Sequence, residues 1–299
     1  MEVKVTFLGT SCMMPTPARN HPAVLLTYKS DNILLDCGEN TQRQLKIAKI
    51  SPASITKILI THWHGDHILG LPGLVQSLIG HQYSGVLEVY GPHGTRKNFE
   101  KMLDFFVLRG NQIKIKVQEV KEGVFFKGRD FQLETIPLKH TIPCLAYAFQ
   151  ETDKRKINLP LVKKLGIPQG PLLGQLQKGE DIKFKGRTIK ADKATTIVKG
   201  KKVTYITDTS LTENCYKIAK NSDLLISEST YLKMDEERAV ERDHLTAGQA
   251  ALIAKKANCR HLALTHYSQR YKDSSLFEKE ARKIFKNTKA MNDFDVIRL

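Results

Sequence analysis

Residues 62–67 read His-Trp-His-Gly-Asp-His, and this short segment constrains the chain more than any other part of its sequence. It gathers imidazole and carboxylate groups, both of which bind divalent metals, into a single loop. Residues 57–61 form an apolar run of strand type, so the loop is expected to leave a rigid sheet. Because Gly65 lets the backbone turn, the first two histidines can face one metal and the last two residues a second.

The ligand types indicate zinc before other metals. Imidazole combined with carboxylate suits Zn²⁺, whereas Mn²⁺ and Fe²⁺ are less favoured alternatives. No cysteine lies near the segment in the sequence, which argues against a closed structural zinc site. A polar loop of solvated histidines is the plain alternative, and the density of ligands disfavours it.

Further segments of strand type each end at a residue that can bind a metal. Residues 133–139 end at His140, residues 203–207 at Asp208, and residues 262–265 at His266. Each would more often be an ordinary edge residue if it stood alone. If these strands and residues 57–61 leave neighbouring sheets at one edge, their ends meet in one cleft, as in many α/β proteins. Asp36 ends another strand and either braces a ligand histidine or forms a turn before Gly38.

The histidine-rich segment and the later His, Asp and His resemble the metallo-β-lactamase superfamily. This resemblance implies an α/β fold of four αββα layers and two Zn²⁺ ions, which Mn²⁺ or Fe²⁺ could replace. It also implies that Asp208 bridges both ions and that Asp66, beside the reacting water, could accept its proton. The other implied ligands are His62, His64 and His140 for the first metal, and Asp66, His67 and His266 for the second.

The charge of the chain narrows the range of partners. With 47 Lys and Arg against 31 Asp and Glu, the formal net charge is +16, which favours an anionic partner such as nucleic acid or an acidic membrane surface. Between Lys154 and Lys190 there are ten basic and two acidic residues, with several glycines and prolines among few apolar side chains. This stretch is expected to add little core and to project as an arm that meets phosphates, although a disordered surface loop is the alternative.

Residues 165–172, Leu-Gly-Ile-Pro-Gln-Gly-Pro-Leu, resemble the flexible arm of the ribonuclease Z family. Members of this family are endonucleases that trim the 3′ trailer from precursor tRNA. The resemblance implies that the arm grips RNA away from the metals. The residues assigned to RNA binding in this way are Lys154, Arg155, Lys156, Lys163, Lys164, Gly170 and Pro171.

Segments outside the arm extend the resemblance to ribonuclease Z. Residues 7–11, Phe-Leu-Gly-Thr-Ser, match the opening of that family, and residues 15–20 are similar to its P-x-K-x-R-N loop. Arg19 and Asn20 would belong to a loop that senses the CCA end of tRNA. Pro17 stands at the lysine position of that loop, which puts discrimination against mature ends in question.

Two further segments suggest a proton donor. Residues 227–230, Ser-Glu-Ser-Thr, are similar to the family's H-E-A-T segment, and residues 244–246, His-Leu-Thr, resemble its H-S-T segment. The resemblance implies that Glu228 orients His244, which donates a proton to the departing ribose oxygen. Without the resemblance, His244 would read as a surface histidine at the start of a helix.

Length and composition favour one catalytic domain, residues 1–299, with the arm inserted at about 151–192. The five cysteines are scattered and odd in number, so no disulfide framework is expected. No segment is long and apolar enough to span a bilayer, and a soluble cytoplasmic protein is therefore expected. Strands are expected near residues 3–8, 22–28, 32–36, 57–61, 86–90, 113–118, 131–138, 203–207, 223–227 and 261–265, and helices near 39–49, after His67, and near 94–108, 211–220, 246–257 and 274–287.

The sequence thus predicts a zinc-dependent endoribonuclease that removes the 3′ trailer from precursor tRNA, leaving a 3′-hydroxyl on the tRNA and a 5′-phosphate on the trailer. The family resemblance also implies a homodimer in which the arm of one subunit grips RNA cut by the other. One alternative is a small-molecule hydrolase of the same fold acting on a phosphodiester, sulfate ester or lactone. Another is an RNA-binding protein with a structural metal, which the complete ligand set together with His244 disfavours.

Overall fold

The computed structural model describes residues 2–108 and 113–299 of the chain. The chain divides into two compact units. The larger unit comprises residues up to 127 together with 133–149 and 202–299, and the smaller unit comprises residues 128–132 and 150–201. Within the described ranges, no helix has both the length and the apolar character that crossing a bilayer requires.

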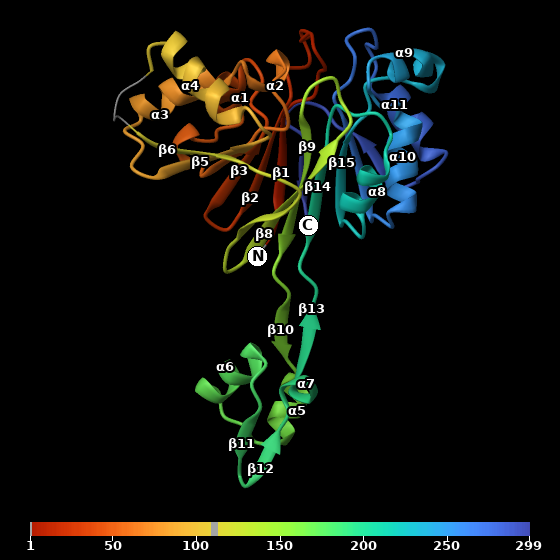
Figure 1. Ribbon diagram of the computed structural model, residues 1–299. Helices are drawn as coiled ribbons and strands as arrows, with labels where there is room; N and C mark the ends of the chain where they lie inside the picture. Colours follow the sequence, from red (N-terminus) through yellow and green to blue (C-terminus); the bar gives the residue numbers. More distant parts are fainter. Residues whose placement is uncertain (1, 109–112) are drawn as a thin grey trace. The chain divides into compact units, whose positions relative to one another are not determined.

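Seven strands of the larger unit form its first sheet, which lies among the warm-coloured N-terminal elements of Figure 1. β1 to β3 pair in antiparallel fashion, and β3 to β6 continue as parallel neighbours. Most residues of β1 to β4 are buried, as their apolar composition predicts. In spatial order the strands are β18 (Val296–Arg298), β1 (Lys4–Gly9), β2 (Ala23–Tyr28), β3 (Asp31–Leu35), β4 (Lys57–Leu59), β5 (Val86–Gly91) and β6 (Lys114–Glu119).

Helices cover one face of this sheet (Figure 1). Leu45, Leu74 and Phe99 are buried helical side chains that pack with Ile58 and Val89 of the strands in one apolar cluster. These helices therefore bury the outer face of the sheet from which the histidine-rich loop leaves. The elements are α1 (Thr41–Ile47), η1 (Pro52–Ser54), α2 (Gly65–Ile68), α3 (Leu71–Gly80) and α4 (Thr95–Phe105).

The second sheet also has seven strands, and its C-terminal part is parallel. β14, β15 and β16 are almost wholly buried and read as continuous apolar runs, which is typical of parallel strands covered on both faces. In spatial order the strands are β17 (Thr288–Ala290), β16 (His261–Thr265), β15 (Leu224–Glu228), β14 (Lys202–Ile206), β9 (Cys144–Glu151), β8 (Phe131–Leu138) and β7 (Gly123–Lys127).

The C-terminal helices pack on the outer face of the second sheet (Figure 1). α10 presents Ala247, Ala250, Ala251 and Ala254, all fully buried, so its backbone can approach its neighbours closely. A capping box between Thr246 and Gln249 fixes its first turn. The helices are α8 (Glu213–Ala219), η2 (Lys233–Asp235), α9 (Glu236–Glu241), α10 (Ala247–Lys256) and α11 (Ser275–Arg282).

Apolar side chains from both sheets meet between them. Leu26 and Leu35 of the first sheet share the lining of a small cavity with Tyr147, Val203 and Tyr205 of the second. With helices on both outer faces, the larger unit has the four layers of the αββα sandwich that the sequence predicted. No bounds were predicted for four strands of the larger unit, β7, β9, β17 and β18. β7, β17 and β18 are short or half-exposed, and their sequences lack a buried apolar run, whereas β9 is a buried strand of eight residues.

The smaller unit has a core of its own, whereas the sequence predicted an arm with little core. Val162, Ile167, Leu176 and Ile182 are buried together with Ala191 and Ala194. The apolar residues are few, but helical spacing gathers them on one side of each short helix. The elements are β10 (Lys154–Ile157), α5 (Leu159–Lys164), α6 (Pro171–Lys178), β11 (Ile182–Phe184), β12 (Arg187–Ile189), α7 (Ala191–Ala194) and β13 (Thr195–Val198), with β10 paired to β13 and β11 to β12.

A close backbone approach at Gly38 holds the loop after β3 against the histidine-rich segment. A Cβ atom at Gly38 would lie 2.4 Å from the carbonyl oxygen of Asp66 and 2.9 Å from that of Pro22. The Gly38 N–H also donates to this Pro22 oxygen at 2.9 Å. Only glycine fits at this position, because any Cβ atom would collide with these two carbonyl oxygens.

We expect Gly38→Ala to lower the free energy of unfolding by about 1–3 kcal/mol, because backbone atoms must shift to admit the methyl group. Gly80→Ala is the matched control, since Gly80 ends α3 and a Cβ there meets nothing within 4 Å. The control is expected to be neutral or to stabilise the chain by about 0.4–1 kcal/mol. Urea titrations followed by circular dichroism compare the two, and equal midpoints would contradict the steric argument.

Candidate metal centre

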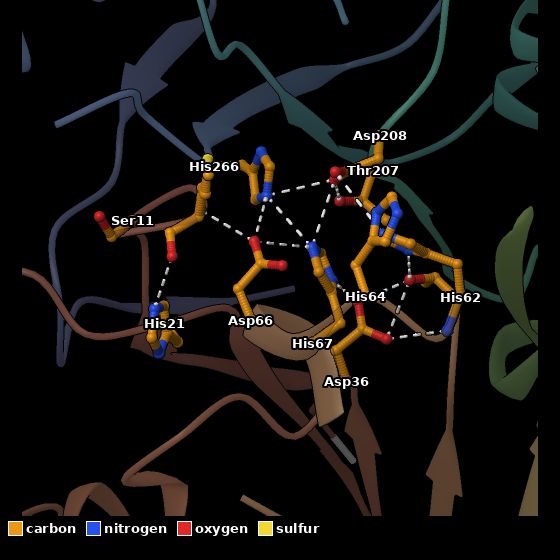
Figure 2. Close-up of polar contacts among 12 residues, drawn as sticks. Ser11, His21, Asp36, His62, His64, Asp66, His67, Thr207, Asp208 and His266 are labelled. Atoms are coloured by element: carbon orange, nitrogen blue, oxygen red, sulfur yellow. Dashed lines mark hydrogen bonds and ion pairs between the residues drawn. The ribbon is translucent and has the colours of Figure 1, made fainter. Parts of the chain in front are cut away.

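The structure brings all the predicted metal ligands together. Figure 2 labels all of them except His140. Those from the first sheet lie in the loop after β4 or in the one-turn helix α2. Those from the second sheet each follow the end of a strand, β8, β14 or β16. The first group is His62, His64, Asp66 and His67, and the second group is His140, Asp208 and His266.

Four of these residues form a first donor set, and their ligand atoms all lie within 4.8 Å of one another. His140 Nε2 lies 3.2 Å from His64 Nδ1 and 3.8 Å from Asp208 Oδ2. The same Asp208 oxygen lies 3.7 Å from His62 Nε2. Three imidazoles and one carboxylate oxygen therefore face one point.

A second donor set shares Asp208 with the first. His67 Nε2 lies 3.4 Å from Asp66 Oδ2, 3.4 Å from Asp208 Oδ1 and 3.2 Å from His266 Nε2. His266 Nε2 also lies 3.2 Å from Asp208 Oδ1. Asp208 thus directs Oδ2 to the first set and Oδ1 to the second.

Hydrogen bonds on the first sheet fix which nitrogen of two ligand histidines carries the proton. The Thr61 hydroxyl donates to the Asp36 carboxylate at 2.9 Å, so its oxygen accepts from His62 Nδ1 at 3.0 Å. His67 Nδ1 donates to Asp36 Oδ2 at 2.8 Å. The Nε2 lone pairs of His62 and His67 therefore point into the centre. Asp36 takes the bracing role that the sequence had left open.

The same logic applies on the second sheet. His140 Nδ1 donates to the main-chain oxygen of Asp243 at 3.2 Å. The Thr230 hydroxyl donates to Glu228 at 2.6 Å, so it accepts from His266 Nδ1 at 3.0 Å. In both histidines Nε2 is left with a lone pair that faces the other ligands. Such outer partners are the usual means of orienting metal-binding imidazoles.

The donor atoms fit divalent cations. His62 Nε2 is fully buried and has no hydrogen-bond partner, although burial of an unpaired nitrogen is costly. His64 Nδ1 lies 3.2 Å from His140 Nε2, a separation that also suits two ligands of one ion. A tetrahedral ion with bonds of 2.0–2.2 Å separates its ligands by about 3.3–3.6 Å. Eight ligand-to-ligand distances within the two sets lie between 3.2 and 3.8 Å, close to this spacing.

The electrostatics of the two sets differ. Burial, reinforced by neighbouring His67, holds the pKa of His62 well below its usual value, so the first set favours neutral imidazoles. Burial also opposes charge on His67, but the attraction of Asp66, Asp208 and Asp36 outweighs it and raises the pKa of His67 well above normal. The carboxylates of the second set therefore stabilise positive charge among them, whether it comes from protonated histidines or from a bound cation.

Glu228 and His244 form a pair beside the second set. Glu228 is fully buried, and His244 Nδ1 donates to its carboxylate at 3.2 Å. Burial opposes charge on His244, but attraction by Glu228 and then Asp208 raises its pKa to about 9. His244 Nε2 lies 4.0 Å from Asp208 Oδ2. The imidazolium therefore keeps a proton at neutral pH on the nitrogen that faces the donor sets.

The residues predicted to sense the end of the substrate lie in the loop after β1. Arg19 is buried, with its guanidinium over the Tyr267 ring and donating to the main-chain oxygen of Tyr271. Asn20 is half-buried and donates from its side chain to the Glu39 oxygen at 2.7 Å. In this structure the Arg19 side chain holds the loop in place and is not turned to solvent.

The residues predicted to bind RNA all lie in the smaller unit. Lys154, Lys156, Lys163 and Lys164 are exposed, whereas Arg155 is partly covered and forms an ion pair with Asp192 at 2.7 Å. The Gly-Pro pair has a local structural reason. Gly170 adopts φ 138°, which only glycine does readily, and Pro171 starts α6, where its missing N–H is not needed.

Sequence reasoning missed several residues of the centre. Thr61 and Thr230 relay hydrogen bonds from ligand histidines to carboxylates, and Asp243 acts through its main-chain oxygen, which leaves no mark in a sequence. Cys12, distant from residues 62–67 in the chain, lies within 4.8 Å of ligand atoms of Asp66 and His266. Its position directly after residues 7–11, the opening segment, was the available signal.

The fold and the donor sets define a member of the metallo-β-lactamase superfamily, a class whose fold implies a divalent metal. The model of the Metallo-beta-lactamase superfamily matches residues 16–152. Ribonuclease Z of Archaeoglobus fulgidus is 39% identical, covering 98% of this chain and 97% of that protein. Ribonuclease Z of Protochlamydia amoebophila is 39% identical, covering 97% of this chain and 94% of that protein. The chain belongs to the ribonuclease Z family.

A solved structure supports the same assignment. Human tRNase Z, short form, superimposes with a TM-score of 0.73 and 26% identity, and the match covers 98% of each chain. The prediction of a metal-dependent endoribonuclease of the ribonuclease Z type is thereby confirmed, and the small-molecule hydrolase is not favoured.

Asp36→Asn tests whether the Asp36 carboxylate orients the ligand histidines. Asparagine tolerates the positive φ of this residue, 58°, so the backbone is expected to persist. An amide has only one accepting oxygen, so its NH₂ group must face either the Thr61 main-chain N–H or the His67 Nδ1–H. We expect metal affinity to fall by about 10- to 100-fold. Competition with a chromophoric chelator measures the affinity.

Tyr205→Phe is the matched control for this variant. It removes only the 3.2 Å hydrogen bond from the Tyr205 hydroxyl to Asp36 and leaves both histidine contacts in place. A smaller loss of metal affinity is expected. If both variants bind metal as tightly as the unchanged chain, Asp36 does not orient the ligands.

Proposed function

We propose that this chain removes the 3′ trailer from precursor tRNA by a single endonucleolytic cut, leaving a 3′-hydroxyl on the tRNA and a 5′-phosphate on the trailer. The observation that carries the proposal is the pair of donor sets joined by Asp208, with the protonated His244 beside them, in a member of the ribonuclease Z family. Two donor sets and a nearby acid are what cleavage of an unreactive phosphodiester requires.

The proposed cofactors are two Zn²⁺ ions per chain. His62, His64 and His140 would hold the first, Asp66, His67 and His266 the second, and Asp208 both. Nitrogen and carboxylate donors at the observed spacing support zinc, while Mn²⁺ or Fe²⁺ remain compatible with the same ligands. Bound metals would polarise the phosphate and lower the pKa of water.

Asp66 and His244 would manage the protons of the reaction. Burial opposes charge on Asp66, but the attraction of His67 and hydrogen bonds from His266 and His67 outweigh it and lower the pKa of Asp66, so the group is an ionised carboxylate. From its place beside the attacking water, this carboxylate would orient the water and take its proton. His244, held by Glu228 through Nδ1, would donate its Nε2 proton to the departing ribose oxygen. Without this proton the ribose would leave as a poor, charged leaving group.

The reaction is tested with precursor tRNA labelled at either end. We expect the purified chain to cut once at the trailer junction, and end-group analysis should find a 3′-hydroxyl on the tRNA. His244→Ala should keep its metal content but lower the single-turnover rate by about 10²- to 10⁴-fold, as is usual when a general acid is lost.

The metal content of the unchanged chain and of His244→Ala is measured by mass spectrometry alongside their cleavage rates. Cleavage by His244→Ala at the unchanged rate, or loss of metal from the variant, would remove His244 from the proposed mechanism. Absence of any cut in precursor tRNA by the metal-loaded chain would overturn the proposed reaction itself.

The predicted arm, an insertion at about 151–192, lies within the smaller unit. This unit is the proposed RNA-binding part of the chain. Its exposed lysines lie on a compact scaffold, which supports phosphate binding more than a disordered loop would. Lys154, Arg155, Lys156, Lys163, Lys164, Gly170 and Pro171 would form this surface or shape it. Arg19 and Asn20 would shape the loop near the end of the substrate. The family resemblance also supports a homodimer in which one chain grips RNA that the other cuts.

Replacing four exposed lysines by glutamine tests this binding role without deleting the core of the smaller unit. The test variant combines Lys163→Gln, Lys164→Gln, Lys178→Gln and Lys183→Gln. We expect it to bind precursor tRNA more weakly, and we expect the slope of log K against log salt concentration to become shallower by about 0.7–0.9 for each phosphate contact that is lost. Cleavage of bis-p-nitrophenyl phosphate should persist, because none of the metal ligands changes. Binding titrations across a salt series provide the measurement.

The matched control changes the same amount of charge on the larger unit. Lys46→Gln, Lys49→Gln, Lys255→Gln and Lys283→Gln are also exposed positions, and they should leave the salt slope nearly unchanged. If both quadruple variants lose affinity equally, net charge alone attracts the RNA and the smaller unit has no special role.

A further inference from the structure

Cys12 lies in the loop that leaves β1 and faces the second donor set. Its sulfur lies within 4.8 Å of ligand atoms of both Asp66 and His266, and these three residues form a candidate metal group of their own. The side chain is 8% exposed, so solvent barely reaches it. A thiol, a carboxylate and an imidazole therefore converge at the second set.

The backbone fixes Cys12 in this place. Its N–H donates to the Tyr267 oxygen at 2.9 Å, and the Tyr267 N–H donates to the Thr10 oxygen at 2.9 Å. The next residue, Met13, donates its N–H to Asp66 Oδ2 at 2.9 Å. Hydrogen bonds thus tie the loop to Tyr267, which follows His266, and to the side chain of Asp66. They hold Cys12 next to both predicted ligands.

The position of this thiol differs from that of the other four cysteines. All five are free and buried. Cys144 also lies close to the centre, but its sulfur donates to the main-chain oxygen of Asp208 at 3.5 Å. Among the described residues, only Cys12 contributes sulfur to a candidate metal group. Cys12 thus faces two of the predicted ligands, whereas Cys144 donates to a main-chain oxygen.

Sulfur changes which cations a site prefers. Thiolate is a soft ligand that favours Zn²⁺ and similar ions, whereas carboxylate and water suit Mg²⁺ and Mn²⁺. A set of two carboxylates and two imidazoles is compatible with both groups. A third residue with sulfur would therefore shift the second set toward the softer cations.

We propose that the Cys12 sulfur contacts the cation held by the second donor set and makes this position prefer Zn²⁺, Co²⁺ and Cd²⁺ over Mn²⁺. The inference rests on the proposed metal site, and it assigns Cys12 a role in metal selection rather than in the cleavage reaction. On binding, the thiol passes its proton to solvent and the thiolate becomes a ligand.

Cobalt substitution of the full chain tests the contact by a readout independent of activity. The chain loaded with Co²⁺ should show a near-ultraviolet sulfur-to-cobalt charge-transfer band, and this band should be lost in Cys12→Ser. Cys144→Ser is the matched control and should retain the band. In competition titrations, Cys12→Ser should bind Cd²⁺ about 10- to 100-fold more weakly, with little change for Mn²⁺.

The outcomes separate the two proposals. Cobalt bound without the band in the unchanged chain would overturn the role of Cys12 while the metal site stands, and this result does not depend on whether a variant folds. A band that persists in Cys12→Ser, or disappears only in Cys144→Ser, would also overturn it. If no cobalt binds at stoichiometric concentration, the metal site and the Cys12 inference fail together.

Discussion

The buried carboxylate of Asp36 is the interaction on which the metal centre most depends. It is fully buried at the end of β3, where an unpaired charge would be very costly. It accepts from the Thr61 N–H and hydroxyl and from His67 Nδ1, all on the first sheet, and from the Tyr205 hydroxyl on the second. The hydrogen bonds that make this burial tolerable are the same ones that aim the His62 and His67 lone pairs. Packing of the two sheets and orientation of the ligands are therefore one requirement.

The two donor sets have opposite electrostatic characters although they share Asp208. The His62 and His67 rings lie only 4.1 Å apart, yet the pKa of one is lowered and that of the other raised. The first set is rich in imidazole and buried, so it accommodates a cation mainly through neutral lone pairs. The second set carries the extra carboxylate of Asp66 and therefore holds positive charge more strongly. The environments of Asp66 and His244 shift their pKa values apart, so Asp66 is ionised and His244 is protonated at the same pH, as the proposed proton transfers require.

The sequence predicted which histidines and aspartates the structure gathers at one place, because these positions are properties of single residues at strand ends. A histidine after residues 57–61 or an aspartate after residues 203–207 can be recognised without knowing the fold. The residues that orient the ligands could not be found in this way. Asp243 acts through a carbonyl oxygen, and Thr230 matters only because the fold puts His266 within 3.0 Å. For the same reason the argument from the absence of nearby cysteine was incomplete, since Cys12 approaches Asp66 only in three dimensions.

The smaller unit shows where composition misleads. Glycine and proline are frequent between Lys154 and Lys190, and the apolar residues are too few for a continuous pattern, which suggested an arm with little core. Yet Val162, Leu176 and Ile182 pack together, because two short helices and a hairpin each contribute one buried side. A small core needs few apolar positions, and the lysines remain exposed on its surface. The proposed phosphate binding would keep its geometry on such a scaffold, because the lysine stems start from ordered helices and strands and would lose less conformational entropy on binding than those of a flexible loop.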